Sequence, residues 1–382
     1  MSDTSFEISG TCAAGFEPVR DAFAANFAER DEIGASVAVA VRGEPVVNLW
    51  AGWADPGRTR AWQQDTLTNV WSTTKAMTSL CAHILMDRGE LDPDAPVARY
   101  WPEFAAGGKS GITVRQIMSH QSGLTGLLVP STVSDYYDWD KITARLAGQE
   151  PLFPPGTASG YQAITFGYLI GEVIRRITGQ SCGRFFASEI AGPLEADFHI
   201  GLPEPELGRC SELLGVRPSE DEQAALAQAY ASADPAALAA LLNPSLTGDE
   251  ANADEWRMAE IPAANGHGTA LGLVTVFGTL TDGSGRLISA ETLEAARTSQ
   301  GRHTDLVLGL PLEFGLGFGL SGPEGHFGPN PAAFGHDGFG GSAVGADPEA
   351  GVAIAYVMNR MGMNLVDDPR KMTLIDAVYR CL

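Results

Sequence analysis

Short apolar runs separated by turns lie near both ends of the chain and predict β-strands. Residues 35–41 and 46–50 are two such runs, joined by a turn at Gly43, and they predict a β-hairpin of buried strands. Near the C-terminus, strand character returns in residues 314–318, 341–345 and 352–357. The strand-forming segments are therefore separated by most of the chain.

Apolar residues at helical spacing predict amphipathic helices. One begins near Phe16, and a second follows Trp71 and ends at Gly89. A third has the clearest apolar stripe, which comprises Phe166, Leu169, Ile170, Val173, Ile174 and Ile177. Helical patterns separated by Pro and Gly continue from about residue 91 to 293, and a last helix is expected at about 369–382.

The order of these elements predicts an α/β fold of the α+β type. We expect residues 1–90 and 296–382 to form a discontinuous α/β domain, with an antiparallel sheet flanked by helices. Residues 91–295 are expected to form a mostly helical inserted domain. Within it, the Ala-rich and acidic stretch at about 205–252 predicts surface helices and loops.

The charge balance argues against some partners. The 382 residues include 25 Lys and Arg against 47 Asp and Glu, a formal net charge of −22. Such a surface repels nucleic acid and anionic lipid, so we expect no nucleic-acid or membrane partner. The longest apolar stretch is too short to span a bilayer. No basic residue precedes Arg20 and no apolar core follows, so we expect no signal peptide and a cytoplasmic protein.

The cysteines suggest no metal or disulfide framework. Their number is odd, no Cys-x-x-Cys spacing occurs and no His cluster lies nearby. They are Cys12, Cys81, Cys182, Cys210 and Cys381. We expect no metal site and no cofactor.

A first chemical motif stands at the start of the second predicted helix. Ser72-Thr-Thr-Lys75 opens that helix, and residues three apart on a helix share a face. The helix N-terminus offers free N–H groups to a developing oxyanion, and a desolvated lysine can serve as the base that a serine hydroxyl needs. Alone, the Ser-x-x-Lys spacing is common, and an ordinary N-terminal serine with a solvated lysine one turn later is the better explanation of it.

Two further motifs accompany it. Tyr161 follows a Pro-Pro-Gly turn and opens the third predicted helix. A phenol held near an ammonium has a lowered pKa and can relay a proton, although a tyrosine can also simply anchor a helix. Residues 335–341 are glycine-rich and precede a strand, so their backbone can approach a bound acyl group, unless they form only a turn.

In this order, Ser72-x-x-Lys75, Tyr161-x-Ala163 and His336-Asp337-Gly338 resemble the motifs of the serine β-lactamase and penicillin-binding-protein superfamily. The class C β-lactamase-like carboxylesterases, family VIII, are the most similar group. The resemblance runs from about residue 16 to the C-terminus and is weakest at 205–260. It implies a β-lactamase/DD-peptidase-like fold, with the active site in the cleft between the two domains.

The resemblance also implies roles for individual residues. Ser72 is the expected nucleophile, and Lys75 and Tyr161 are expected to share the general-base and general-acid work. Which of the two takes the first proton stays open. The backbone N–H groups of Ser72 and Phe339 are the expected oxyanion hole.

His336, Gly338 and Ala163 are the expected substrate-binding residues, and two of them depart from the lactamase pattern. Class C lactamases have Tyr-x-Asn, but the third position here is Ala163, which has no amide to bind a lactam side chain. His336 replaces the lysine of Lys-Thr-Gly and is mostly neutral near pH 7. Both changes favour neutral esters over lactams.

The remaining histidines have weaker cases. We expect His120 to have a structural, hydrogen-bonding role, whereas His267 either borders the cleft or belongs to a loop. No spacing identifies a carboxylate that would pair with His326 or His336 in a triad. The chain also lacks Gly-x-Ser-x-Gly, which argues against an α/β-hydrolase.

These features predict a serine carboxylesterase that hydrolyses short-chain acyl esters through an acyl-enzyme on Ser72. A β-lactamase, a D-amino-acid amidase or peptidase, or an acyltransferase could use the same site. A non-catalytic penicillin-binding-like module is the alternative of another class, and the intact motif residues argue against it. The sequence determines neither the physiological substrate nor the oligomeric state.

Overall fold

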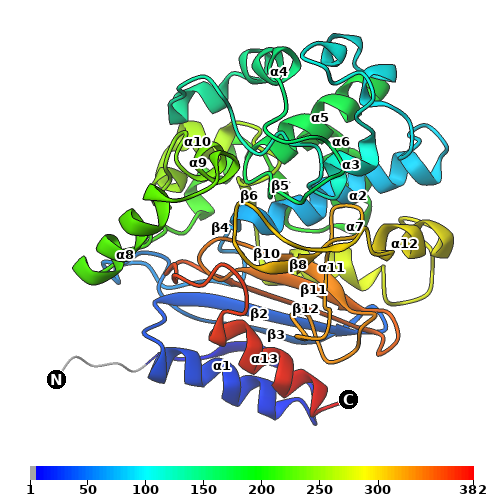
Figure 1. The fold of residues 1–382 in the computed structure, drawn as a ribbon. Helices are drawn as coiled ribbons and strands as arrows, with labels where there is room; N and C mark the ends of the chain where they lie inside the picture. Colours follow the sequence, from blue (N-terminus) through cyan, green and yellow to red (C-terminus); the bar gives the residue numbers. More distant parts are fainter. Residues whose placement is uncertain (1–5) are drawn as a thin grey trace.

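A seven-stranded antiparallel sheet, built from both ends of the chain, organises the structure (Figure 1). This computed structural model describes residues 6–382; residues 1–5, part of the stretch in which no signal peptide is expected, lie outside it. The strand order is β1-β3-β2-β12-β11-β10-β9. The strands are β1 (Ser9–Cys12), β2 (Gly34–Val41), β3 (Glu44–Gly52), β9 (Gly319–Leu320), β10 (Phe334–Asp337), β11 (Ala343–Asp347) and β12 (Val352–Met358).

Helices cover both faces of this sheet. The helices α1 (Glu17–Glu29) and α13 (Pro369–Tyr379) pack together below it, and α11 (Ala270–Gly278) packs against β2 and β12 from above (Figure 1). A strand covered on both faces has no polar side, and β12 is accordingly buried along its whole length. The pairing of β2 with β12 joins the two ends of the chain into one core.

The other helices lie mainly above the sheet, around the long buried helix α2 (Thr74–Asp87). They are α3 (Val114–Met118), α4 (Trp139–Gly148), α5 (Thr165–Thr178), α6 (Cys182–Phe186), α7 (Gly192–Leu194), α8 (Glu220–Ala231), α9 (Pro235–Leu241), α10 (Asp254–Met258) and α12 (Ala290–Arg297). None of the helices within residues 6–382 combines the length and the apolar character needed to cross a bilayer.

Two small sheets complete the fold. One has the order β4-β6-β5, and the other pairs β7 with β8. Their strands are β4 (Thr68–Asn69), β5 (Phe198–Ile200), β6 (Gly266–Gly268), β7 (Arg302–Thr304) and β8 (Pro311–Glu313). The predicted antiparallel sheet flanked by helices, with a largely helical middle segment, is confirmed.

Individual strand predictions differ in outcome. The hairpin of residues 35–50 and the strand at 352–357 are confirmed as β2, β3 and β12. The predicted strand at 341–345 begins two residues later, because Gly341 has a φ of +120° and belongs to the preceding turn. The predicted strand at 314–318 is wrong. There Gly317 has a φ of +80°, and its N–H donates to the carbonyl of Met118 instead of to a neighbouring strand.

Candidate active site

Ser72 stands in a short 3₁₀ turn, Trp71–Thr73, that leads directly into α2. Trp71 has a φ of +45°, a conformation that costs free energy for a bulky residue and persists only where the surroundings enforce it. Its indole packs against Trp256 and Phe339, with ring centroids 5.2 and 5.6 Å away. This packing holds the turn that places Ser72 at the N-terminus of α2, as the sequence predicts.

Lys75 lies in the first turn of α2 with its side chain fully buried. Its Nζ is 2.9 Å from Ser72 Oγ, 2.7 Å from the carbonyl oxygen of Ala163 and 3.0 Å from that of Ala263. No carboxylate among residues 6–382 forms an ion pair with it. Burial therefore lowers the pKa of Lys75 well below its ordinary value, which favours the neutral amine.

Tyr161 brings its phenol to the same place. The Lys75 Nζ lies 4.8 Å from the centroid of the Tyr161 ring, and the Tyr161 hydroxyl interacts with that of Ser72. Burial raises the pKa of Tyr161, and the interaction with the Ser72 hydroxyl opposes this only in part. The expected lowering of this pKa is wrong, because desolvation dominates and the neighbouring lysine itself tends to lose its charge.

Tyr161 does not open a helix, and this prediction is also wrong: α5 begins only at Thr165. The Tyr161 N–H donates to the carboxylate of Asp305 over 3.1 Å, and the Gln162 N–H donates to Nδ1 of His120 over 3.2 Å. These N–H groups are bonded to side chains outside the segment, which lies in neither a helix nor a strand. The expected structural role of His120 is confirmed.

Asp305 is a residue that sequence reasoning missed. Its buried carboxylate accepts hydrogen bonds from Ser159 Oγ at 2.7 Å and from the N–H groups of Tyr161, Val307 and Leu308 at 2.9–3.1 Å. It thereby fastens the Tyr161 segment to the loop that carries Leu308 into the cavity. Its bonds to Val307 and Leu308 are local, but no local signal could have identified its link to Tyr161, which lies 144 residues away along the chain.

Phe339 lies in the tight turn between β10 and β11, facing the nucleophile turn. Within residues 6–382, the N–H groups of Ser72 and Phe339 have no hydrogen-bond partner. Ser342 ties the two turns together, because its Oγ donates to the Val70 carbonyl over 2.8 Å. Two unpaired N–H groups beside a serine hydroxyl can stabilise an oxyanion.

Gly338 is the first residue of this turn and is not among the residues that line the cavity. A Cβ at this position would collide with the Val70 carbonyl and with Ser342 Oγ. The glycine therefore permits the close approach of the two turns.

His336 lines the cavity from β10 with its ring buried. Its Nδ1–H donates to the Asp337 carbonyl over 2.7 Å, and its Nε2 has no partner within residues 6–382. Burial, aided by the charge of Lys75, lowers the pKa of His336 to about 3. The ring is therefore neutral at pH 7 and presents an acceptor.

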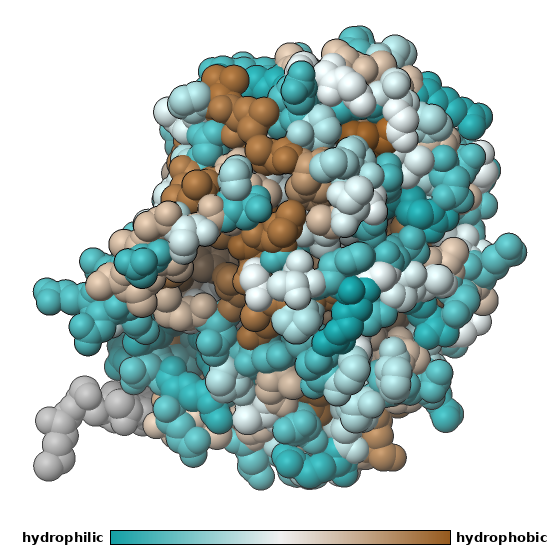
Figure 2. All heavy atoms as spheres, in the orientation of Figure 1, coloured by the Kyte–Doolittle hydropathy of each residue, from teal (hydrophilic) through white to brown (hydrophobic). Residues whose placement is uncertain are grey.

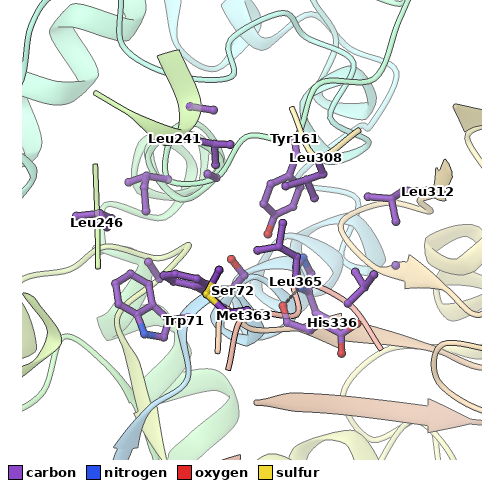
Figure 3. A pocket seen from close by; sticks show the side chains of 18 of the residues that line it. Trp71, Ser72, Tyr161, Leu241, Leu246, Leu308, Leu312, His336, Met363 and Leu365 are labelled. Carbon is purple, nitrogen blue, oxygen red and sulfur yellow. Dashed lines mark hydrogen bonds between the residues drawn. The ribbon is translucent and has the colours of Figure 1, made fainter. Parts of the chain in front are cut away.

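These groups meet at the floor of a cavity of about 420 Å³ (Figure 3). Ser72, Tyr161, Ala163, His336 and Phe339 all line it. Most of the other lining side chains are apolar, and none of them is a lysine or an arginine.

His267 and His326 differ in their relation to the cavity. His267 belongs to β6 and does not line the cavity. His326 lines the cavity and does have a carboxylate partner, Asp367, with Nδ1 2.7 and 2.9 Å from its two oxygens. Spacing did not reveal this pair, because the two residues come from different loops. Within residues 6–382, no three His, Cys, Asp or Glu side chains gather to hold a metal ion.

Solved structures share this architecture. A family VIII carboxylesterase has a TM-score of 0.92 and 46% sequence identity, over 98% of this chain and all (100%) of that chain. A penicillin-binding protein homolog from Caulobacter crescentus has a TM-score of 0.89 and 42% identity, with 98% and 100% covered. These likenesses define the protein as a serine hydrolase with a β-lactamase-like fold.

The sequence gives the family directly. The chain belongs to the Beta-lactamase family, which matches residues 19–378. Among curated proteins, the esterase/beta-lactamase LipL of Mycobacterium tuberculosis is 37% identical over 385 residues, which cover 95% of this chain and 86% of LipL. The resemblance to β-lactamase-like carboxylesterases is confirmed, and the non-catalytic alternative is set aside.

Proposed function

We propose that this protein is a serine carboxylesterase that hydrolyses neutral acyl esters, short-chain esters among them, through an acyl-enzyme on Ser72. The contact of 2.9 Å between Lys75 Nζ and Ser72 Oγ carries the proposal. A fully buried amine with a lowered pKa and no carboxylate partner is suited to accept the serine proton.

In the first half-reaction, Lys75 takes the proton of Ser72 as Oγ attacks the ester carbonyl carbon. The N–H groups of Ser72 and Phe339 stabilise the oxyanion. The bond to the alcohol oxygen then breaks. Tyr161, whose raised pKa keeps it protonated, gives its proton to the leaving alkoxide and recovers one from the Lys75 ammonium.

In the second half-reaction, water attacks the acyl carbon. Its proton passes to the neutral Lys75, directly or through Tyr161, and the carbonyl oxygen again occupies the oxyanion hole. The bond between the acyl carbon and Ser72 Oγ breaks, Ser72 regains the proton held by Lys75, and the carboxylic acid leaves. The protons and bonds of the two half-reactions balance without a redox partner or a metal.

The cavity favours neutral substrates. The carboxylate of a β-lactam or of a peptide C-terminus would find no lysine or arginine among the described residues that line it. His336 is neutral at pH 7, and Ala163 offers no side-chain hydrogen bond. Because burying an unpaired charge costs free energy, anionic substrates are at a disadvantage.

The nucleophile is tested with Ser72→Ala. We expect ester hydrolysis to fall on the order of 10⁶-fold, because no other group can hold the acyl chain. Intact-mass spectrometry after fluorophosphonate treatment should show one adduct on the wild type and none on the variant. Ser245→Ala is the matched control, since Ser245 also lines the cavity but makes no contact with Lys75. An adduct mapped to another serine would overturn the assignment.

The bond preference is tested by comparing kcat/KM for a short-chain p-nitrophenyl ester with that for a cephalosporin. We expect the ester to be strongly preferred. Ala163→Asn should improve cephalosporin hydrolysis relative to the ester, by about tenfold or more if one hydrogen bond to a polar group is regained in the transition state. A wild type that prefers the cephalosporin would replace the esterase with a β-lactamase.

A further inference from the structure

Helix α8 stands at the edge of the cavity with almost no support from the core. None of its residues is buried, and only Leu226 and Tyr230 are partly covered. These two side chains are four residues apart, so they share one face of the helix. Both line the cavity. The apolar face of α8 is therefore turned toward the active site.

Local interactions, and not core packing, account for the presence of this helix. Ser219 and Glu222 form a capping box at its N-terminus, and three acidic residues occupy its first turn. The remaining positions are mostly alanine and face solvent. An exposed, capped helix that presents two large apolar side chains to a cavity is suited to cover what the cavity binds.

The cavity extends to both sides of Ser72. In Figure 3, Trp71, Leu241 and Leu246 lie on one side of the serine, and Tyr161, Leu308 and Leu312 lie on the other. In the proposed mechanism Tyr161 protonates the leaving alcohol, so the alcohol occupies the Tyr161 side. The acyl group then extends toward Trp71 and Leu246.

This acyl side continues to α8 and is mainly apolar, with Ser245 and Thr247 as uncharged polar exceptions beside Leu246. Its lining side chains carry no charge and include Trp71, Val216, Leu226, Tyr230, Leu241 and Leu246. On this face of the molecule, hydrophobic residues gather around the recess beside α8 and α9 (Figure 2). Met363 and Leu365 also line the cavity and are each 41% exposed, which leaves apolar surface uncovered in the free protein.

We infer that this branch, closed by Leu226 and Tyr230 of α8, binds the hydrocarbon chain of a medium-chain acyl group. The inference rests on the proposed function and extends its substrate class beyond short-chain esters. A hydrocarbon chain is the occupant that matches an uncharged, elongated branch starting at the nucleophile. It would also complete the cover of the apolar face of α8, which residues 6–382 cover only in part.

The first test measures kcat/KM for p-nitrophenyl acetate, butyrate, hexanoate, octanoate and decanoate. Each buried methylene contributes up to about fourfold, so we expect kcat/KM to rise at least to octanoate, mainly through a lower KM. A fall that begins at butyrate would overturn the inference while leaving the carboxylesterase in place. Failure to hydrolyse any ester, acetate included, would instead overturn the proposed function.

The second test places a charge on the inner face of α8. Leu226→Glu should lower the ratio of octanoate to acetate kcat/KM by about tenfold or more, because a chain would then meet a buried carboxylate. Ala227→Glu adds the same charge to the same helix at a position outside the cavity, and it should keep the wild-type ratio. Tyr230→Glu repeats the test one turn later. Ratios that stay at the wild-type value in both inner-face variants would show that α8 does not contact the acyl chain.

Discussion

Lys75 shows how burial changes the chemistry of a single side chain. Its Nζ has three neighbours: the carbonyls of Ala163 and Ala263 and the hydroxyl of Ser72. A neutral amine has two N–H bonds and one lone pair. If the two N–H bonds are donated to the two carbonyls, the lone pair is left for the Ser72 hydroxyl. Burial thus disfavours the ammonium, and the two carbonyls in the same buried site orient the lone pair of the neutral amine toward Ser72.

The pH dependence follows from the opposite pKa shifts of Lys75 and Tyr161. The pKa of Lys75 is lowered, so its active base form is present above that value and is lost as the pH falls through it. The pKa of Tyr161 is raised, so its phenol stays protonated into the alkaline range. We expect kcat/KM for a short-chain ester to rise from acid pH to a plateau that covers neutral and mildly alkaline pH.

Lys75→Arg is the variant for this prediction. Its guanidinium stays protonated, so the activity should drop by about 10²–10⁴-fold, with no recovery at mildly alkaline pH. A wild-type optimum in the acid range, with activity falling toward neutral pH, would contradict Lys75 as the base.

At the scale of elements, the site depends on segments that are tied together by buried polar groups. The Tyr161 segment is a loop, with no helix or strand of its own to hold it. The carboxylate of Asp305 connects it to the loop between β7 and β8, which also carries Leu308. A single buried carboxylate thus fixes both a candidate proton donor and one wall of the cavity.

Asp305→Ala tests this connection. We expect kcat to fall by up to about 10²-fold, because the phenol of Tyr161 is no longer held in place. The charge of Asp305 also helps to raise the pKa of Tyr161, so the alkaline end of the activity plateau should move to lower pH. Ser159→Ala, which removes only one donor to the same carboxylate, is the control. An unchanged pH profile together with a lower kcat would assign Asp305 a purely structural role.

At the scale of the whole molecule, one arginine links the C-terminal helix to the site. Arg370 of α13 donates to Glu32, just before β2, over 2.9 Å and to Asp368 over 2.8 and 3.0 Å. It also donates over 2.6 Å to the carbonyl of Gly340, which lies in the same turn as Phe339. The chain ends thus hold the turn that is expected to form half of the oxyanion hole.

Arg370→Met should lower the free energy of unfolding by about 3–5 kcal/mol, because it leaves the buried Glu32 carboxylate without its cation. Arg360→Met is the matched control. Its ion pair with Asp31 is 3.5 Å long and exposed, so its loss should cost less than about 1 kcal/mol. Denaturant unfolding of the three proteins measures both changes. Equal effects of the two substitutions would contradict the role of Arg370.

Much of this protein is encoded by local sequence. The alternation of small and branched apolar residues predicts β2 and β12, because a strand covered on both faces has no polar positions. The Ser-x-x-Lys spacing predicts the contact of Ser72 with Lys75, because one helical turn separates them. The sequence likewise indicates the family, since its three motifs appear in the expected order.

Tertiary structure decided the remaining features, which depend on residues far apart in the chain. The direction of the Tyr161 pKa shift depends on how deeply the folded protein buries the phenol, and local sequence predicts the opposite sign. The role of Asp305 and the pairing of His326 with Asp367 require loops brought together by folding. Only the folded structure shows that the apolar face of α8 lines the cavity. Periodicity specifies which residues share a face, whereas burial and long-range contacts arise from the complete fold.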